Sequence, residues 1–311
     1  MNSQRVPAKR NPKQPRSIGS GQVLTRLGFL LLRSLSYLPL PIIAGIAWMV
    51  SPLMYACFGS RRRIVLKNLS TCFPDKNSDE LGVIAKRCFC LTIQTGMSTG
   101  INWWASEARL AGMISVSGRE HYDNALANGR NIILLAPHVI ALEVGGFELS
   151  RERPMITMYQ RTKNPLVDAT IESARSRYGG ALVERKEPLR NLLKLIRQGK
   201  PFYYLPDQDG GRKGVFVPFF SAQASTIPMI GKFAALCDAV VIPCFTRIKP
   251  RGAGWVVELG EAIDSWPSNN IAAATLMNQV IENWVKHNPE QYFWLHKRFK
   301  TRPLGEEAFY E

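Results

Sequence analysis

The chain has 311 residues, 46% of them hydrophobic, and a formal net charge of +16. This length allows one large domain with appendages or two small domains, and the hydrophobic content suffices for a substantial core. Its six cysteines form no C-x-x-C pair and no cysteine/histidine cluster with metal-ligand spacing, so we expect buried thiols in a reducing compartment and no structural zinc.

The positive charge is concentrated near the N-terminus. The first acidic residue is Asp75, and eleven Lys and Arg residues precede it. A basic block beside an apolar run favours the anionic surface of a membrane. Nucleic acid is the competing partner for basic charge, but the chain carries no zinc-finger, RNA-recognition or helix-turn-helix signature. We therefore expect membrane lipids as a partner, and no nucleic acid.

The N-terminal region divides into a tail and an apolar segment. Residues 1–22 are rich in Lys, Arg, Pro, Gln, Ser and Gly, which predicts a basic disordered tail. Residues 23–60 are the expected membrane anchor, because residues 34–60 carry no charged side chain and are long enough to cross a bilayer. Three prolines in this run would kink a span. Two arrangements remain open, one transmembrane helix or a helix pair lying in one leaflet.

A helical connecting region is expected over residues 61–110. Residues 61–71 continue as a basic helix, which a Phe-Pro pair ends. Ser78 can then cap a helix that runs to about residue 94.

Alternating strands and helices are expected from residue 113 onwards. The expected strands are 113–116, 132–136, 155–159, 181–184, 202–205, 239–245 and 255–259. The expected helices are 122–127, 165–178, 188–198, 227–237, 271–286 and 289–299. This alternation predicts an α/β fold, with a mostly parallel sheet flanked by helices over residues 111–303. The N-terminal membrane helix precedes this domain, and residues 304–311 form a short tail.

One candidate catalytic pair stands out. His138 directly follows the expected central strand, and Glu143 comes five positions later with only uncharged residues between them. Five steps along a helix rotate by about 140°, so the two side chains meet only if His138 lies in the turn and Glu143 in the following helix. A histidine held by a carboxylate at a strand end has the arrangement of a general base with its orienting group. The alternative interpretation is a core histidine satisfied by its neighbours.

Further polar residues follow other expected strands. Arg161 comes after one strand, Asp207 and Asp209 come after another, and Arg247 lies just beyond a third. In open α/β sheets, ligands bind at the carboxyl ends of the strands, so we expect these side chains to surround His138. Arginine is the preferred fork for phosphate or carboxylate.

The motif His138-x4-Glu143 resembles the H-x4-D/E motif of the glycerolipid and lysophospholipid acyltransferases. Other stretches make the chain similar to the late acyltransferases of lipid A biosynthesis, the lauroyl/myristoyl transferase group. These are residues 206–209 (Pro-Asp-Gln-Asp), 215–220, 224–226 and 289–303, with Asn68 and the Phe-Pro pair after the apolar segment. The chain departs from the family at Gln208, where many relatives carry histidine, and at Ile227, where threonine is frequent.

The resemblance implies transfer of a fatty acyl chain from a thioester on acyl carrier protein to a hydroxyl of a lipid A precursor. That acceptor would carry phosphates, Kdo sugars and 3-hydroxyacyl chains, as in Kdo-lipid IVA. The enzyme would lie at the bacterial inner membrane with its catalytic domain on the cytoplasmic side. No metal or other cofactor is implied.

The resemblance also implies roles for the candidate residues. His138 would take the hydroxyl proton during attack on the thioester, and Glu143 would fix the imidazole tautomer and stabilise its positive charge. We expect two arginines, Arg161 and Arg247, to bind phosphate or sugar acid. Two carboxylates, Asp207 and Asp209, would position an arginine or the acceptor head group.

Three alternatives belong beside this interpretation. A related acyltransferase acting on a lysophospholipid or another glycolipid would share the motif. A hydrolase with a nucleophilic serine is disfavoured, because no G-x-S-x-G elbow is present. A non-catalytic membrane scaffold is disfavoured by the intact His138 and Glu143.

Overall fold

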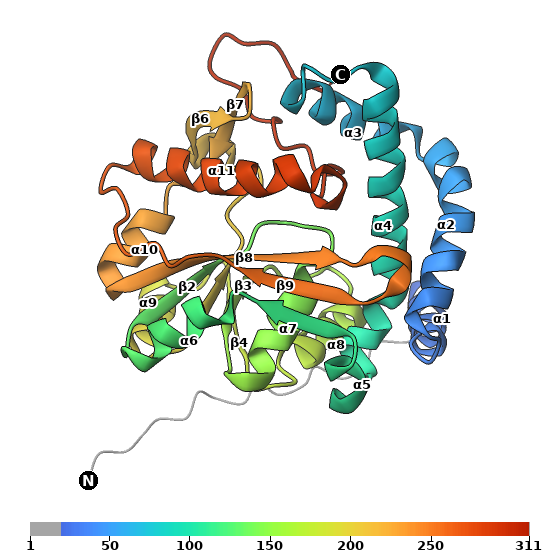
Figure 1. Ribbon diagram of the computed structural model, residues 1–311, viewed down its shortest axis with the longest axis horizontal. Helices are drawn as coiled ribbons and strands as arrows, with labels where there is room; N and C mark the ends of the chain where they lie inside the picture. Colours follow the sequence, from blue (N-terminus) through green and yellow to red (C-terminus); the bar gives the residue numbers. More distant parts are fainter. Residues whose placement is uncertain (1–19, 311) are drawn as a thin grey trace.

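The computed structural model describes residues 20–310, so residues 1–19 of the expected basic tail lie outside the described residues. A seven-stranded sheet lies at the centre, in the order β1-β9-β8-β2-β5-β3-β4 (Figure 1). The strands are β1 (Ile114–Ser117), β2 (Asn131–Leu135), β3 (Ile156–Tyr159), β4 (Ala181–Glu184), β5 (Phe202–Tyr204), β8 (Ala239–Ile248) and β9 (Trp255–Leu259). Neighbours from β8 to β4 are parallel, β8 and β9 are antiparallel, and β9 and β1 are again parallel. The expected mostly parallel sheet is confirmed.

Helices cover both faces of the sheet. They are α1 (Ser20–Leu35), α2 (Leu40–Cys57), α3 (Gly59–Cys72), α4 (Ser78–Trp104), α5 (Glu107–Ala111), α6 (Arg119–Ala127), α7 (Leu142–Glu152), α8 (Pro165–Arg175), α9 (Leu189–Arg197), α10 (Ile230–Cys237) and α11 (Asn270–His287). Figure 1 shows α11 on one face of the sheet and α6 and α7 on the other. The core divides accordingly. Ile133 and Leu135 of β2 join a cluster with α11, whereas Ile132 and Leu134 join one with α6 and α7. This alternation follows from the two-residue period of a strand.

Short elements complete the chain. A hairpin of β6 (Val215–Phe219) and β7 (Ala222–Thr226) lies apart from the main sheet, next to α11. Single turns of 3-10 helix are η1 (Gly211–Lys213), η2 (Pro250–Gly252) and η3 (Pro289–Gln291). The hairpin could not be predicted from the sequence, because its Pro218 and the short polar stretch of β7 obscure the strand pattern.

Two predicted helices differ in the structure. The helix expected over residues 289–299 is wrong beyond η3, because this segment pairs with the turn after β2 instead, through a bridge between Val139 and Tyr292. The helix expected to end near residue 94 runs on to Trp104. Its cap is Asn77 and not Ser78, since the Asn77 side chain accepts from the backbone N–H groups of Asp79 and Glu80, both at 3.0 Å.

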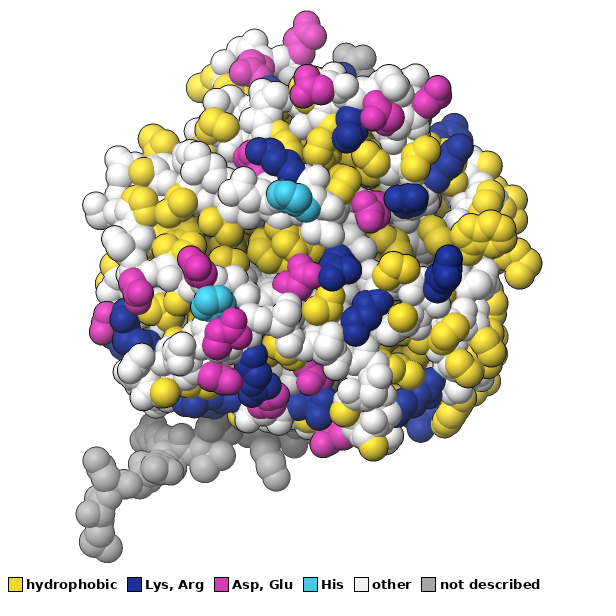
Figure 2. Space-filling view, in the orientation of Figure 1, with side chains coloured by type: hydrophobic (Ala, Val, Ile, Leu, Met, Phe, Trp, Pro, Cys, Tyr) yellow, Lys and Arg dark blue, Asp and Glu magenta, His cyan; other side chains and the backbone are white. Residues whose placement is uncertain are grey.

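The expected apolar anchor forms two helices. Pro39 separates α1 from α2, and Pro52 lies inside α2. Within residues 20–310, α2 is the one helix that is long and apolar enough to cross a bilayer. Hydrophobic side chains gather along the edge of the molecule where α2 lies (Figure 2).

Candidate active site

The turn between β2 and α7 carries the two residues of the predicted motif. His138 follows the buried end of β2, and Glu143 lies in the first turn of α7. Tyr203 holds the start of this helix, since its hydroxyl donates to the carbonyl of Leu142 at 2.8 Å. Gly145 allows α7 to approach β8 closely, because a Cβ there would collide with the hydroxyl of Thr246 on β8. Close packing against the sheet therefore fixes the position of Glu143.

The carboxylate that contacts the His138 imidazole belongs to Asp207. Its Oδ1 lies 2.7 Å from Nδ1 of His138. The backbone N–H of His138 also donates to both oxygens of Asp207, at 3.0 and 2.9 Å. The expected contact between His138 and Glu143 is replaced by this one, because the turn after β5 brings Asp207 beside the turn after β2, its neighbour in the sheet.

Asp207 is ionised and accepts every hydrogen bond that reaches it. Its side chain is 1% exposed. Burial alone would raise the pKa of this carboxyl, but the charge of His138 and hydrogen bonds from His138 and Tyr292 lower the pKa to about 2. An ionised carboxylate can only accept, so Nδ1 of His138 carries the proton and donates it to Asp207. Whenever the ring is neutral, this tautomer leaves Nε2 unprotonated, as a general base requires.

The C-terminal segment that includes Tyr292 and Phe293 also holds His138 and Asp207 in place through hydrogen bonds. The hydroxyl of Tyr292 donates to Oδ2 of Asp207 at 2.8 Å, and the N–H of Phe293 donates to the carbonyl of His138 at 3.0 Å. Asn68 of α3 holds the same segment by donating to the carbonyls of Trp294 and His296, at 2.8 and 2.9 Å. Segments from four parts of the chain thus determine where the imidazole lies.

Glu143 has a different partner. Its Oε1 accepts from Nε of Arg175 at 3.0 Å and also from Nη2 of the same guanidinium. Arg175 is the last residue of α8, so this ion pair joins α7 to α8. Both side chains are partly exposed, at 26% for Glu143 and 32% for Arg175. The pair therefore faces solvent-accessible space and is not part of the core.

A cleft of about 730 Å³ lies beside His138. Its walls come from the carboxyl ends of β2, β3 and β5, from α4 and α7, and from the segment before α10. Two cations line it, Arg175 and Arg185. Three buried polar atoms along it have no hydrogen-bond partner among the described residues, namely Thr95 Oγ1, Asn102 Oδ1 and Tyr204 Oη. Thr95 and Asn102 therefore add polar side chains to a cleft wall that already carries two cations.

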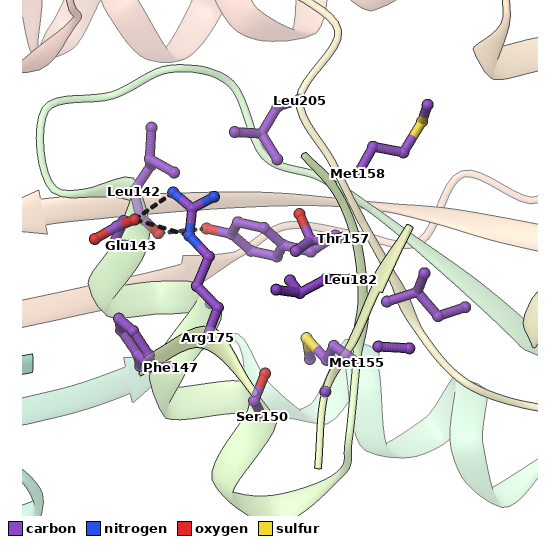
Figure 3. A pocket seen from close by; sticks show the side chains of 15 residues that line it. Leu142, Glu143, Phe147, Ser150, Met155, Thr157, Met158, Arg175, Leu182 and Leu205 are labelled. Carbon is purple, nitrogen blue, oxygen red and sulfur yellow. Dashed lines mark hydrogen bonds and ion pairs between the residues drawn. The ribbon is translucent and has the colours of Figure 1, made fainter. Parts of the chain in front are cut away.

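A smaller apolar pocket of about 80 Å³ adjoins the cleft (Figure 3). Phe147, Met155 and Leu182 surround it, and Arg175 reaches across to Glu143 at one side. Six residues line both this pocket and the cleft: Leu142, Glu143, Met158, Arg175, Tyr203 and Leu205. The ion pair therefore lies where a polar space meets an apolar one.

The other predicted site residues lie in several places. Asp209 lines the cleft, but its two oxygens accept from the N–H and hydroxyl of Thr301, at 3.1 and 2.9 Å. Arg161 is exposed and pairs with Glu184 at 3.2 Å. Neither Arg161 nor Arg247 is among the residues that line the cleft.

Arg247 stays inside the sheet because β8 is longer than expected. The strand runs on to Ile248, and Nε of Arg247 donates to Glu258 of β9 at 2.8 Å. The second oxygen of Glu258 accepts from the indole N–H of Trp284 at 2.7 Å. The guanidinium is thus engaged in an ion pair between β8 and β9.

The sequence alone does not identify Arg175, Arg185 or Tyr292 as site residues. Arg175 lies near the end of an expected helix, and no spacing relates it to Glu143, 32 residues earlier. Tyr292 lies within the quoted C-terminal stretch, so that stretch carried the available signal. The fit of a tyrosine hydroxyl to Asp207 requires the folded chain.

Comparison with known proteins identifies the family of the chain. A family model described as bacterial lipid A biosynthesis acyltransferase matches residues 12–301. The chain belongs to this family. It is 33% identical to the lipid A biosynthesis lauroyltransferase of Escherichia coli K12 over 290 residues, which cover 92% of this chain and 94% of the relative.

Two further relatives extend the comparison. The lipid A biosynthesis palmitoleoyltransferase of E. coli K12 is 28% identical over 289 residues, 92% of this chain and 94% of the relative. The lipid A biosynthesis myristoyltransferase of the same organism is 30% identical over 250 residues, 79% of this chain and 77% of the relative. The predicted acyltransferase class is confirmed, and the protein is an acyltransferase of lipid A biosynthesis.

Proposed function

We propose that this lipid A acyltransferase moves a fatty acyl chain from a thioester on acyl carrier protein to a hydroxyl of a lipid A precursor of the Kdo-lipid IVA type. The observation that carries the proposal is the pairing of His138 with Asp207 beside a cleft with polar and cationic walls. The family and the names of its relatives support the acceptor class.

His138 acts as the general base. Its Nε2 takes the proton of the acceptor hydroxyl while that oxygen attacks the thioester carbonyl. The tetrahedral intermediate then collapses, the carbon–sulfur bond breaks, and the imidazolium returns the proton to the departing thiolate. Asp207 holds the imidazole through Nδ1 and stabilises the positive charge that forms on the ring. The products are an ester on the acceptor and a free thiol on the carrier.

Glu143 acts through Arg175. The carboxylate holds the guanidinium at the boundary between the cleft and the apolar pocket. Oriented there, Arg175 stabilises negative charge in the cleft, on the intermediate or on an acceptor phosphate. Arg185 supplies a second cation on the cleft wall for the anionic acceptor.

The N-terminal helices attach the enzyme to the inner membrane, with the catalytic domain on the cytoplasmic side. The support is the exposed apolar surface of α1 and α2, together with the arginines that flank it. Such attachment brings the cleft to acceptors that are themselves lipids.

The test is an assay with purified protein, a labelled acyl group on acyl carrier protein, and a lipid A precursor. Wild type should form the labelled ester, and His138→Ala should not. The matched control is His121→Ala, because His121 lies on α6 outside the cleft. Transfer to a lysophospholipid in preference to the lipid A precursor would overturn the proposed acceptor. Wild-type turnover by folded His138→Ala would overturn the mechanism.

A further inference from the structure

The exposed side of α1 and α2 is unusually apolar. Leu24, Trp48 and Met49 are 73%, 74% and 70% exposed. Other large apolar residues with exposed side chains on these helices are Val23, Leu27, Leu30, Leu31, Ile42, Val50 and Leu53. No charged residue occurs anywhere in α2. A continuous apolar surface of this kind marks an interaction site and not ordinary solvent-facing structure.

The opposite side of α2 is part of the protein core. Leu40, Ile43, Ala47 and Ser51 are buried and form one stripe, at spacings of three and four residues. They face α4, and Figure 1 shows the two helices running alongside each other. Consequently α2 has one face for the folded domain and one for a partner, whereas a helix that crosses a bilayer alone contacts lipid all round.

The segments before and after α2 are both hydrogen-bonded to the folded domain. Before the helix, the guanidinium of Arg109 donates to the carbonyls of Ser36 and Leu38. After the helix, Arg61 donates to the carbonyl of Leu295 at 3.2 Å, and Asn68 holds the same C-terminal segment. The α1 helix is fixed as well, because a Cβ at Gly100 of α4 would collide with the carbonyl of Leu32.

Because α2 is held against the folded domain along its length, its orientation relative to the bilayer also determines where that domain lies. The 18 residues of α2 span about 27 Å, close to the thickness of the hydrocarbon core. If α2 crossed the bilayer, its two ends would lie on opposite sides and α4 would enter the hydrocarbon with it. Lys86 and Arg87 of α4 are exposed charges, and charged side chains facing lipid are strongly disfavoured there.

We propose that α1 and α2 lie in the plane of a single leaflet, with their apolar side at the boundary between head groups and acyl chains, and that neither crosses the bilayer. The partner is an anionic phospholipid surface. Arg26 and Arg33 on α1 and Arg61 and Arg63 on α3 are exposed around the apolar side, where they meet anionic head groups.

This orientation places the active site close to the lipid surface. Thr95, Thr99 and Asn102 of α4 line the cleft, while other residues of α4 pack against α1 and α2. One helix therefore separates the lipid-facing side from the cleft. The inference rests on the proposed membrane attachment and is independent of the acyl-transfer mechanism.

Three matched Ser→Cys variants test the topology in membrane vesicles of either orientation. The background carries Cys57→Ser and Cys90→Ser, because the other four cysteines are buried. Exposed reporters are Ser34 before α2, Ser60 after it, and Ser78 on the folded domain. A membrane-impermeant maleimide should modify the introduced cysteine of all three variants in vesicles of one orientation, and of none of them in vesicles of the other orientation. Modification of Ser34→Cys from the side opposite to Ser60→Cys, or from neither side, would overturn the proposal.

Vesicle flotation gives a second measurement. Binding to vesicles of phosphatidylethanolamine and phosphatidylglycerol should fall about tenfold or more for Trp48→Glu and for Leu53→Glu. The control is Leu236→Glu, since Leu236 is an exposed apolar residue of α10, and it should bind as wild type does. Equal binding by all three variants would overturn the proposal. Acyl transfer in detergent micelles reports separately on the proposed reaction.

Discussion

Nδ1 of His138 and Oδ1 of Asp207 lie 2.7 Å apart, although the two residues are 69 positions apart in the chain. Two backbone hydrogen bonds from His138 to the same carboxylate reinforce the contact. The ring and its own backbone are therefore oriented by one buried group. Such double attachment restricts the imidazole to one rotamer, which is what a general base needs to meet a hydroxyl at a fixed position.

Replacing Asp207 should affect the chemical step more than binding. In Asp207→Asn the amide can no longer stabilise the imidazolium, and its NH₂ group disfavours the Nδ1-protonated tautomer. We expect kcat to fall by about 10²–10⁴-fold, with a smaller change in the acceptor KM. The measurement is steady-state acyl transfer, with thermal unfolding to establish that the variant is folded. A fall confined to KM would assign Asp207 to acceptor binding.

His138 and Asp207 should behave as one unit. His138→Ala should abolish transfer while the fold persists, because Asp207 still accepts from the backbone N–H of residue 138 and from the hydroxyl of Tyr292. The double variant His138→Ala/Asp207→Asn should be no slower than His138→Ala alone, since the carboxylate has no imidazole left to orient. A further large loss in the double variant would show a second role for Asp207.

The strands and most helices could be predicted because local pattern determines them. The run from Asn131 to Leu135 is apolar and bounded by Gly129 and Pro137, so it reads as a buried strand without any tertiary information. The segment after Pro289 could not be predicted in this way. Its backbone follows the β2–α7 turn instead of forming a helix, and that partner is remote in sequence.

The histidine could be predicted from the sequence, but its partner could not. Glu143 is the nearest carboxylate in the chain, and proximity in sequence favoured it. Asp207 reaches His138 because β2 and β5 are neighbours in the sheet, and strand order does not follow from local pattern. The predicted Arg161 and Arg247 do not line the cleft for a similar reason, since each forms an ion pair with a carboxylate of a neighbouring strand.

The pair of Glu143 and Arg175 gives a third prediction. If the carboxylate acts by orienting the guanidinium, Glu143→Gln and Arg175→Gln should each reduce kcat/KM, and the double variant should be about as active as the weaker single one. The expected coupling energy is on the order of 0.5–3 kcal/mol. The measurement is a double-mutant cycle, with Arg247→Gln as the control. Additive losses would mean that Glu143 acts independently of Arg175, which is compatible with the direct role first expected for it.

The acceptor KM should depend on the cations of the cleft wall. Arg185 lines the cleft, whereas Arg247 is engaged by Glu258. Arg185→Ala should therefore raise the acceptor KM more than Arg247→Ala does, by about tenfold or more, since a hydrogen bond to a charged group contributes roughly 1.5–3 kcal/mol. The measurement is the acceptor KM of each variant, obtained by varying the acceptor concentration at a saturating donor concentration. A larger effect from Arg247→Ala would restore the assignment first made from the sequence.

The low pKa of Asp207 predicts how stability depends on pH. Its pKa falls from 3.8 to about 2 on folding, because the contributions of His138 and Tyr292 outweigh burial. A depressed carboxyl pKa stabilises the native state above the unfolded value, by roughly 2 kcal/mol here. This stabilisation should be lost progressively as the pH falls from about 4 towards 2. Tyr292→Phe removes one hydrogen bond to the carboxylate and should raise the pKa of Asp207, which moves that loss to higher pH.

Chemical unfolding between neutral and acidic pH measures this effect, and the difference between wild type and Tyr292→Phe removes the contribution of other carboxylates. We expect the variant to be less stable near neutral pH, by roughly 1.5–3 kcal/mol, and the difference to shrink as Asp207 becomes protonated in both proteins. Tyr37→Phe is the control, because Tyr37 is 69% exposed. A stability difference that stays constant down to acidic pH would show that the Tyr292 hydroxyl does not act through the charge of Asp207.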